Sequence, residues 1–375
     1  MAAAAPSDPV HPGSTGSIMA TDSCNAAVQC VQIGPRCIGP GQRAYVIAEA
    51  GVNHNGSIGE ALRMVDAARQ AGADAVKFQA FKATRLASRL AEQAAYQKDA
   101  AGAPSQVEML ERLELKAGEF ARLKQHCDGA GIEFLATPFG VEDLRILLDL
   151  GVRAVKIASP DIVNRPLLEA AAESRLPMLL STGASEAWEI DRAHDLLWRQ
   201  WRVPLVLLHC VSSYPTKLEH ANLGRIRALR QRYGCPAGFS DHTTEPSAGA
   251  LAVAAGASIL EKHFTLDRSQ PGPDQGFSLL PAELAEYVCQ ARLAEAAMGD
   301  GGLDLGPIER EVRSVSRCSV VTGEDIPAGG VIGRHMLAVK RPGLGISPWQ
   351  IDEVAGRRAK QHISADTPIT WDMLD

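Results

Sequence analysis

The chain has 375 residues, of which 46% are hydrophobic and 22% charged, and its formal net charge is −6. This is ordinary globular composition, and the length suits one large domain with a small one. We expect no nucleic-acid partner, because binding a phosphate backbone requires clustered Lys and Arg, and the chain has no long basic run. No apolar run approaches the roughly 20 residues that span a bilayer, so we expect no membrane partner either.

The first 30 residues are rich in Ala, Ser, Gly and Pro. They lack the basic start and the apolar stretch of about 7–15 residues that mark a secretory signal peptide. We therefore expect residues 1–30 to form a disordered tail and the protein to be cytoplasmic. The eight cysteines include no Cys-x-x-Cys pair. We expect them to be mostly reduced thiols rather than a disulfide framework or a zinc ribbon.

From residue 44 onward, short β-rich runs alternate with amphipathic helical stretches, which predicts parallel strands joined by helices. Eight such units favour a closed (β/α)₈ TIM barrel over an open doubly wound sheet, and we place the barrel domain at residues 31–298. Residues 31–42 are expected to form a hairpin that plugs the bottom of the barrel. The eight expected strands are Tyr45–Ala48, Ala75–Phe78, Glu133–Ala136, Ala154–Ile157, Met178–Ser181, Leu205–His209, Ala237–Ser240 and Ser258–Lys262.

The alternation of strands and helices stops after Met298. Residues 299–312 begin with a Gly- and Asp-rich stretch and are expected to be a linker. Short apolar segments separated by Gly- and Pro-rich turns follow, so we expect a small β-rich domain at residues 313–375.

Catalysis in TIM barrels takes place at the carboxyl ends of the strands. All eight expected strands end in polar and often ionisable residues. A solvated edge explains one or two such ends but not eight that include two lysines, so we interpret them as an active site. These residues are Glu49, Lys77, Gln79, Thr137, Lys156, Ser159, Ser181, Thr182, His209, Ser212, Ser213, Tyr214, Ser240, Asp241, His242, Glu261 and His263.

His242 and His263 occupy corresponding positions on neighbouring expected strands, which lie about 4.8 Å apart. Both imidazoles can therefore reach one ion, whereas a single histidine is more often structural. Asp241 and Glu261 can supply a further oxygen ligand or orient the rings. Two histidines with oxygen ligands suit a divalent metal such as Mn²⁺ or Zn²⁺.

Lys77 and Lys156 are both expected to point toward the barrel mouth. A buried lysine requires an anionic partner or a lowered pKa. One interpretation pairs both lysines with protein carboxylates. The other is a pocket for an anionic substrate, because hydroxyls around two cations suit phosphate and carboxylate oxygens.

A series of motifs resembles the sialic acid synthase family (N-acetylneuraminate synthase-like) over residues 31–375, in the order of that family. The terminal segments DIPAGGVI and LAVKRPGLGI resemble the antifreeze-like (SAF) domain of the same family, here at residues 313–375. The barrel motifs are IAEAGVNHNGS (47–57), VKFQAFKA (76–83), ATPFG (136–140), KIASPDIVNRPLL (156–168), LSTGAS (180–185), LHCVSSYPT (208–216), GFSDHT (238–243) and ILEKHFTLDRSQPGPDQGFSL (259–279).

This resemblance implies a condensation of phosphoenolpyruvate with an open-chain N-acylated amino sugar of the N-acetylmannosamine type, which yields a nonulosonic acid and phosphate. It implies a metal on His242 and His263, with Mn²⁺ expected and Mg²⁺ or Co²⁺ as alternatives. Glu49 and Glu261 are both candidates for deprotonating the attacking water. The implied phosphoenolpyruvate ligands are Lys77, Thr137, Lys156, Ser159, Ser181, Ser212 and Ser240.

On the sugar and water side, the resemblance places Glu49, Gln79, Asp161, Tyr214 and Asp274. It also implies a domain-swapped homodimer, in which Arg341 of one subunit contacts the N-acyl group of the sugar in the other. For Arg341, the alternative is a surface charge in a turn.

Two positions depart from the pattern of the family: Ser212 stands where some members have Asn, and Asp161 where many have Glu. The shorter carboxylate leaves the acceptor sugar open, so a legionaminic or pseudaminic acid synthase that uses a diacetamido-trideoxyhexose is the alternative. A 3-deoxy sugar-acid synthase acting on a phosphorylated aldose and a non-catalytic carbohydrate-binding protein are more remote alternatives.

Overall fold

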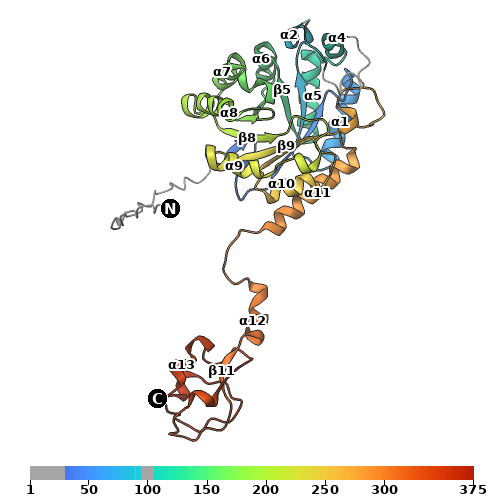
Figure 1. Ribbon diagram of the computed structural model, residues 1–375. Helices are drawn as coiled ribbons and strands as arrows, with labels where there is room; N and C mark the ends of the chain where they lie inside the picture. Colours follow the sequence, from blue (N-terminus) through green and yellow to red (C-terminus); the bar gives the residue numbers. More distant parts are fainter. Residues whose placement is uncertain (1–29, 89, 94–104) are drawn as a thin grey trace, which may run out of the picture. The chain divides into compact units, whose positions relative to one another are not determined.

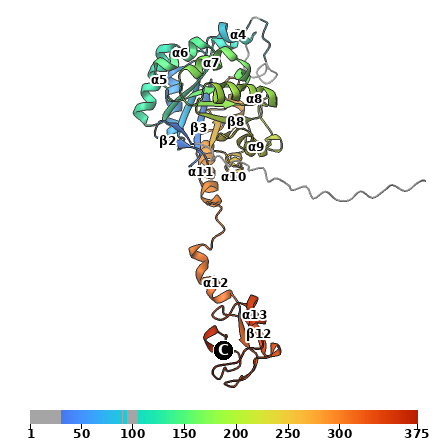
Figure 2. The ribbon, with the colours of Figure 1, turned by 90° about the vertical axis from the view of Figure 1, so that its left-hand side faces the viewer.

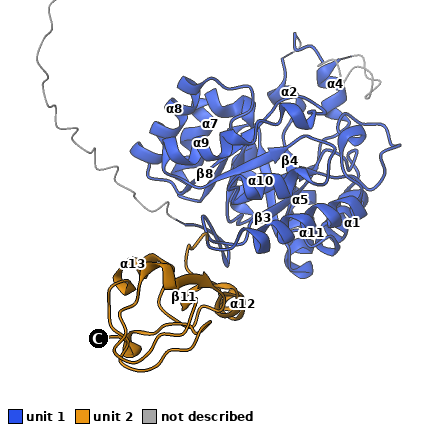
Figure 3. Ribbon diagram, turned by 60° about the horizontal axis from the view of Figure 1, so that its bottom comes forward, with its two compact units in different colours: residues 1–300 blue, residues 301–375 orange. Residues whose placement is uncertain are grey.

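The computed structural model describes residues 30–88, 90–93 and 105–375. The tail expected at residues 1–30 therefore lies outside the described residues, except for Cys30. The chain forms two compact units, residues 1–300 and residues 301–375, which are coloured separately in Figure 3. Within the described residues, no helix is both long and apolar enough to cross a membrane.

The first unit is built on an eight-stranded parallel sheet with the order β5-β4-β3-β10-β9-β8-β7-β6. The two end strands, β5 and β6, also pack against each other, which makes the sheet barrel-like. The predicted TIM-barrel fold is therefore confirmed. The strands are β3 (Tyr45–Gly51), β4 (Ala75–Ala80), β5 (Glu133–Pro138), β6 (Val155–Ile157), β7 (Met178–Ser181), β8 (Leu205–Cys210), β9 (Ala237–Asp241) and β10 (Ile259–His263).

Helices surround these strands in both views of the unit (Figures 1 and 2). Local sequence sets several of their ends. Ser57 caps the first helix by accepting a hydrogen bond from the backbone of Glu60, and Gly131 ends α5 in the left-handed conformation. The helices are α1 (Ile58–Gln70), α2 (Ala83–Leu86), α4 (Gln106–Glu111), α5 (Ala117–Ala130), α6 (Val141–Asp149), α7 (Arg165–Glu173), α8 (Ala187–His194), α9 (Gly224–Tyr233), α10 (Ala248–Ala254) and α11 (Pro281–Met298).

The predicted hairpin is present as β1 (Val31–Ile33) paired antiparallel with β2 (Arg36–Ile38). Its apolar side chains are buried in one cluster with residues from the starts of the barrel strands, among them Tyr45 and Ala75. The hairpin thus closes the amino-terminal end of the barrel, as predicted.

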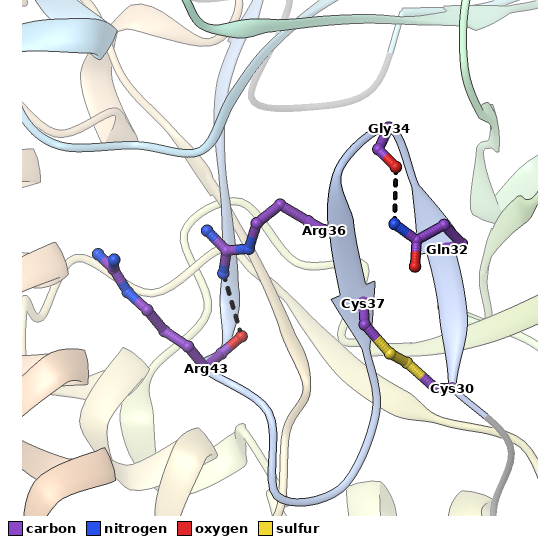
Figure 4. Close-up of a disulfide and its surroundings, with 6 residues drawn as sticks. All are labelled: Cys30, Gln32, Gly34, Arg36, Cys37 and Arg43. Carbon is purple, nitrogen blue, oxygen red and sulfur yellow. Dashed lines mark hydrogen bonds between the residues drawn. A yellow bond between two sulfur atoms is a disulfide. The ribbon is translucent and has the colours of Figure 1, made fainter.

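A disulfide joins Cys30 to Cys37 across this hairpin (Figure 4). The sequence predicted mostly reduced thiols, and among the described cysteines this pair is the exception. The antiparallel pairing of two very short strands brings the Cα atoms to 5.8 Å, which is within the usual range for a disulfide. The free cysteines among the described residues are Cys127, Cys210, Cys235, Cys289 and Cys318.

The second unit is small and β-containing. Its strands β11 (Ser319–Thr322) and β12 (Leu337–Lys340) pair antiparallel, and α12 (Arg310–Ser316) and α13 (Ile351–Val354) are its helices. It has a core of its own, formed by residues Val320, Ile326, Ile332, Leu337, Ile346, Val354, Ala359, Ile363, Ile369 and Leu374.

Candidate active site

Four charged side chains meet inside the barrel at the carboxyl ends of the strands: Glu49, Lys77, Lys156 and Glu261, here called the charge cluster. The Nζ of Lys77 lies 2.7 Å from Oε2 of Glu49 and 3.6 Å from Oε2 of Glu261. It also donates a hydrogen bond to Oγ1 of Thr137 at 2.9 Å. The Nζ of Lys156 lies 3.5 Å from Oε1 of Glu261. All five side chains are buried, so strands distant in sequence bring together one desolvated group.

The two carboxylates of the charge cluster differ in protonation. Burial raises the pKa of Glu49 to about 7, because desolvation outweighs the attraction of Lys77. Burial acts on Glu261 in the same direction, but Lys156 and Lys77 outweigh it and bring its pKa below the usual range. Ser240 adds a hydrogen bond to Oε1 of Glu261 at 2.8 Å. Glu261 is therefore a fixed negative charge near neutral pH, whereas Glu49 can exchange a proton.

The two lysines also differ. Burial opposes the charged form of Lys77, but Glu261 and Glu49 outweigh it, so the pKa of Lys77 is raised. Burial lowers the pKa of Lys156, whose Nζ contacts Glu261 only at 3.5 Å and donates a long 3.3 Å hydrogen bond to the Ile157 carbonyl. An incoming anion would improve the surroundings of Lys156 more than those of Lys77.

Hydroxyl groups gather around Gly183, just beyond β7. The Gly183 N–H donates to Oγ of Ser159 at 2.9 Å. A Cβ added at Gly183 would lie 2.5 Å from Oγ of Ser212, 2.7 Å from Sγ of Cys210 and 2.9 Å from Oγ of Ser159, so only glycine leaves room here. The nearby Ser181 has a buried Oγ without a hydrogen-bond partner. Because Cys210 also influences the pKa of Lys156, this hydroxyl cluster adjoins the charge cluster.

His242 and His263 lie side by side at the ends of β9 and β10, with ring centroids 5.5 Å apart. Two aromatic rings flank them. The Tyr214 ring is 4.3 Å from that of His242, and the Phe277 ring is 5.3 Å from that of His263. Tyr214 was predicted for this side of the site, whereas Phe277 was not.

Both histidines fit a metal cation. Nδ1 of His242 lies 2.9 Å from the carbonyl oxygen of Val211, which only accepts hydrogen bonds, so Nδ1 carries a proton and Nε2 is the nitrogen left for a cation. Burial opposes the charged form of His242, but Cys210 and the Val211 carbonyl outweigh it and raise its pKa, so a cation at Nε2 would displace a proton. Nδ1 of His263 is buried without a hydrogen-bond partner, and burial holds the pKa of His263 well below its usual value. Within the described ranges, no group of three or more His, Cys, Asp or Glu side chains is arranged to hold a metal. A cation here would take its other ligands from water or substrate oxygens.

The residues predicted for the sugar side partly adjoin these histidines. A Cβ added at Gly51 would lie 3.4 Å from Oδ2 of Asp274, Oε1 of Glu49 and Cε1 of His263, which places all three around one glycine. Burial raises the pKa of Asp274 to about 6. Gln79 makes a long hydrogen bond to Oε1 of Glu49 at 3.5 Å.

Two of the polar residues at strand ends point away from the interior, and Asp161 contacts Asn164 within its own turn. The carboxylate of Asp241 pairs with Lys262 rather than with an imidazole, because side chains alternate across a strand and both residues point away from the interior. His209 also faces outward, with Nε2 2.6 Å from the Ala221 carbonyl oxygen. Oδ1 of Asp161 accepts a hydrogen bond from Asn164 at 2.9 Å, and its buried Oδ2 has no hydrogen-bond partner.

Gly183, Phe277 and Lys262 were not predicted from the sequence to belong to the site or its support. A glycine two residues after a strand end was a usable signal for Gly183. The strict alternation of side chains along β10 was a usable signal for Lys262. Phe277 lies on the short turn Gln275–Phe277, and no local pattern marks its contact with the histidines.

The NeuB family model matches residues 64–302, and the SAF domain model matches residues 317–375. The chain therefore belongs to the NeuB family and carries a C-terminal SAF domain, which confirms the resemblance to sialic acid synthases. N,N'-diacetyllegionaminic acid synthase of Legionella pneumophila is 39% identical over 348 residues, which cover 92% of this chain and 97% of that protein. N-acetylneuraminate-9-phosphate synthase of Mus musculus is 32% identical over 343 residues, which cover 91% of this chain and 95% of that protein.

A solved structure supports the same assignment. The N-acetylneuraminic acid (sialic acid) synthetase of Leptospira borgpetersenii superposes with a TM-score of 0.70 at 40% sequence identity, covering 76% of this chain and 95% of that one. The fold and the relatives together support a sialic-acid-type synthase.

Proposed function

We propose that the protein condenses phosphoenolpyruvate with an N-acylated amino sugar, giving a nonulosonic acid and inorganic phosphate. The observation that carries this proposal is that an anion-binding part of the site lies next to a part with paired histidines. The charge cluster and the hydroxyl cluster offer two cations and several neutral donors to an anion. The paired histidines, Tyr214 and Asp274 lie on the other side of Glu49 and suit a neutral polyhydroxylated acceptor.

His242 and His263 would hold a divalent cation, with Mn²⁺ as the first expectation and Mg²⁺ or Co²⁺ as alternatives. When bound, such a cation polarises an aldehyde oxygen and stabilises negative charge that develops on it. The lowered pKa of His263 and the orientation of His242, whose Nδ1 is engaged by the Val211 carbonyl, support this assignment.

The residues of the chain divide the remaining chemistry. Lys77, Lys156 and the serines hold the carboxylate and phosphate of phosphoenolpyruvate. The electrons of its double bond form the new bond from the methylene carbon to the aldehyde carbon, and the aldehyde C=O pair moves onto oxygen, which takes up a proton. Water adds to the electron-poor C2 and gives up one proton. The bond from C2 to the phosphate oxygen then breaks, phosphate leaves with the bonding electrons and takes the second proton from the C2 hydroxyl, and C2 becomes the ketone. Glu49 takes the proton of that water, because its pKa lies near neutrality, whereas Glu261 is held ionised by the lysines.

Arg341 supplies a further contact to the acceptor from the SAF domain of a second copy, in the manner of a domain-swapped dimer. Arg341 is exposed on its unit, and Leu344 and Trp349, which follow it, are 69% and 94% exposed. Large apolar side chains at this exposure are typical of a docking surface. The segment from Arg341 to Trp349 is therefore our candidate for the surface that meets the second copy.

For the acceptor, a diacetamido-trideoxyhexose is a second candidate beside N-acetylmannosamine. The 39% identity to a legionaminic acid synthase favours it. Either acceptor carries the N-acyl group and the aldehyde that the proposal requires.

The test is to incubate the protein with phosphoenolpyruvate, Mn²⁺ and a panel of acceptors, and to follow phosphate release and product mass. We expect phosphate release only with free N-acyl amino sugars, and loss of turnover on chelation. Turnover with arabinose 5-phosphate or erythrose 4-phosphate instead would identify a 3-deoxy sugar-acid synthase. Sugar binding without any product would favour a non-catalytic binding protein, and turnover in the presence of chelator would rule out the metal.

A further inference from the structure

A second charged pair lies on the opposite face of the two strands that carry the histidines. Asp241 precedes His242 on β9, Lys262 precedes His263 on β10, and the two are partners in the parallel register. The Nζ of Lys262 lies 3.1 Å from Oδ2 of Asp241, and the two side chains are 1% and 0% exposed. This pair joins the two strands one residue before each imidazole.

Lys262 also holds the residue on the far side of His242. Its ammonium donates to the backbone carbonyl of Thr243 and lies 3.3 Å from Oγ1 of Thr243. The N–H of Thr243 in turn donates to Oδ1 of Asp241 at 2.8 Å. Both neighbours of His242 are thus tied to the side chain that immediately precedes His263.

The helices seal this arrangement from water. The Lys262 ammonium lies 5.6 Å from the ring centroid of Tyr287, a fully buried residue of α11. A Cβ added at Gly249 of α10 would lie 2.6 Å from Cζ of Tyr287, so the neighbouring helix is shaped to admit that ring. The ion pair therefore stays dry, and its geometry is constrained on all sides.

A contribution to the stability of the fold does not by itself account for a buried ion pair of this kind. Removing two charges from water is costly, and apolar residues of similar size are often at least as stabilising. What an apolar pair lacks is the directional link between Asp241, Thr243 and Lys262 that fixes the backbone on both sides of His242 relative to His263.

We propose that Asp241 and Lys262 are positioning residues that set the spacing of the two imidazoles for a divalent cation, an inference that rests on the metal site proposed above. Groups that orient metal ligands typically change metal affinity by about 10- to 100-fold when they are mutated. The pair differs from the charge cluster in that its side chains lie on the face of the strands that points away from the barrel interior.

The experiment is calorimetric titration of the full-length protein with MnCl₂ alone, together with the visible absorption of the Co²⁺ form and thermal unfolding. We expect Lys262→Met to raise the Kd for Mn²⁺ by about 10- to 100-fold and to alter the Co²⁺ absorption bands. Lys262→Arg, which keeps the positive charge, should have most of the wild-type affinity.

In the double variant Asp241→Leu/Lys262→Met, the melting temperature should recover from its value in Lys262→Met, while Mn²⁺ binding stays weak. Thr243→Val, which removes one acceptor only, should weaken binding by a few-fold and serves if Lys262→Met does not fold.

The matched control is Arg292→Met, which breaks the pair between Arg292 and Asp74 at 2.9 Å, before the first residue of β4. It should lower stability and leave Mn²⁺ affinity unchanged. Wild-type Mn²⁺ affinity in the double variant or in Lys262→Met would overturn the positioning role while the metal site stands. Wild-type protein that binds Mn²⁺ no better than His242→Ala would overturn the metal site, and the positioning role with it.

Discussion

Lys77 and Glu49 face each other across neighbouring strands, with Nζ and Oε2 2.7 Å apart and side chains only 4% and 2% exposed. Lys77 is thus the cation that keeps two buried carboxylates, Glu49 and Glu261, together in one site.

Lys77→Met should leave both carboxylates without their shared partner and remove a ligand for phosphoenolpyruvate. We expect kcat/KM for phosphoenolpyruvate to fall by at least about 100-fold in a phosphate-release assay. Lys116→Met, on an exposed helix cap, should be neutral.

Glu49→Gln keeps the size of the side chain and removes its ability to take a proton. We expect kcat to fall by about 100-fold or more, with little change in the KM for phosphoenolpyruvate. Glu111→Gln on the surface is the control. If Glu49→Gln instead changed only the KM for the sugar, the proton-accepting role would pass to Glu261.

Gly183→Ala tests the hydroxyl cluster. The added methyl group would meet Ser159, Cys210 and Ser212 at 2.9 Å or less, and side chains or backbone must shift to accept it. We expect a loss of about 1–3 kcal/mol in unfolding free energy and a higher KM for phosphoenolpyruvate. Gly118→Ala, in α5 with open space around it, should be neutral or stabilising. Unchanged kinetics in Gly183→Ala would separate this cluster from substrate binding.

His54 predicts a pH dependence of stability. It is fully buried, and burial lowers its pKa from 6.5 to about 4. Between these values the unfolded chain binds the proton more readily, so stability falls as the pH drops from 6.5 toward 4 and is unaffected above 6.5. The full effect corresponds to about 3 kcal/mol. Urea unfolding of His54→Gln should show a flatter profile than wild type in this window, whereas the exposed His220→Gln should not.

Arg341→Ala tests the contribution of the SAF domain. We expect the KM for the acceptor sugar to rise by about 10-fold or more, with the KM for phosphoenolpyruvate unchanged, because the guanidinium is proposed to meet only the N-acyl group. Arg334→Ala, also exposed on this unit, is the control. An equal loss for both substrates would speak against the contact with the acceptor.

The sequence predicted the barrel closely because its signal is local. Each strand is a short apolar run, and β7 begins and ends at the predicted residues. The charge cluster was predictable for the same reason, since strand ends in a parallel barrel meet at one face. The direction of a side chain at a strand end was harder to predict. Asp241 and His242 are adjacent, yet one points toward the helices and the other toward the interior.

Features that depend on which residues meet in the folded chain were not predictable from one sequence. The Cys30–Cys37 disulfide depends on two three-residue strands, for which the spacing of the cysteines carries no signal. The difference between Glu49 and Glu261 likewise depends on which lysines lie nearest, and their sequence contexts are equally polar.

The hairpin of β1 and β2 restricts how substrates and products can enter and leave the barrel. Because its buried side chains close the amino-terminal end of the barrel, we expect substrates to reach the charge cluster from the opposite rim, where the strands end. Under the proposed reaction, two substrates arrive and two products depart by that route. The sugar-acid product occupies the place of the acceptor sugar before it leaves. We therefore expect strong inhibition by this product, competitive with the acceptor.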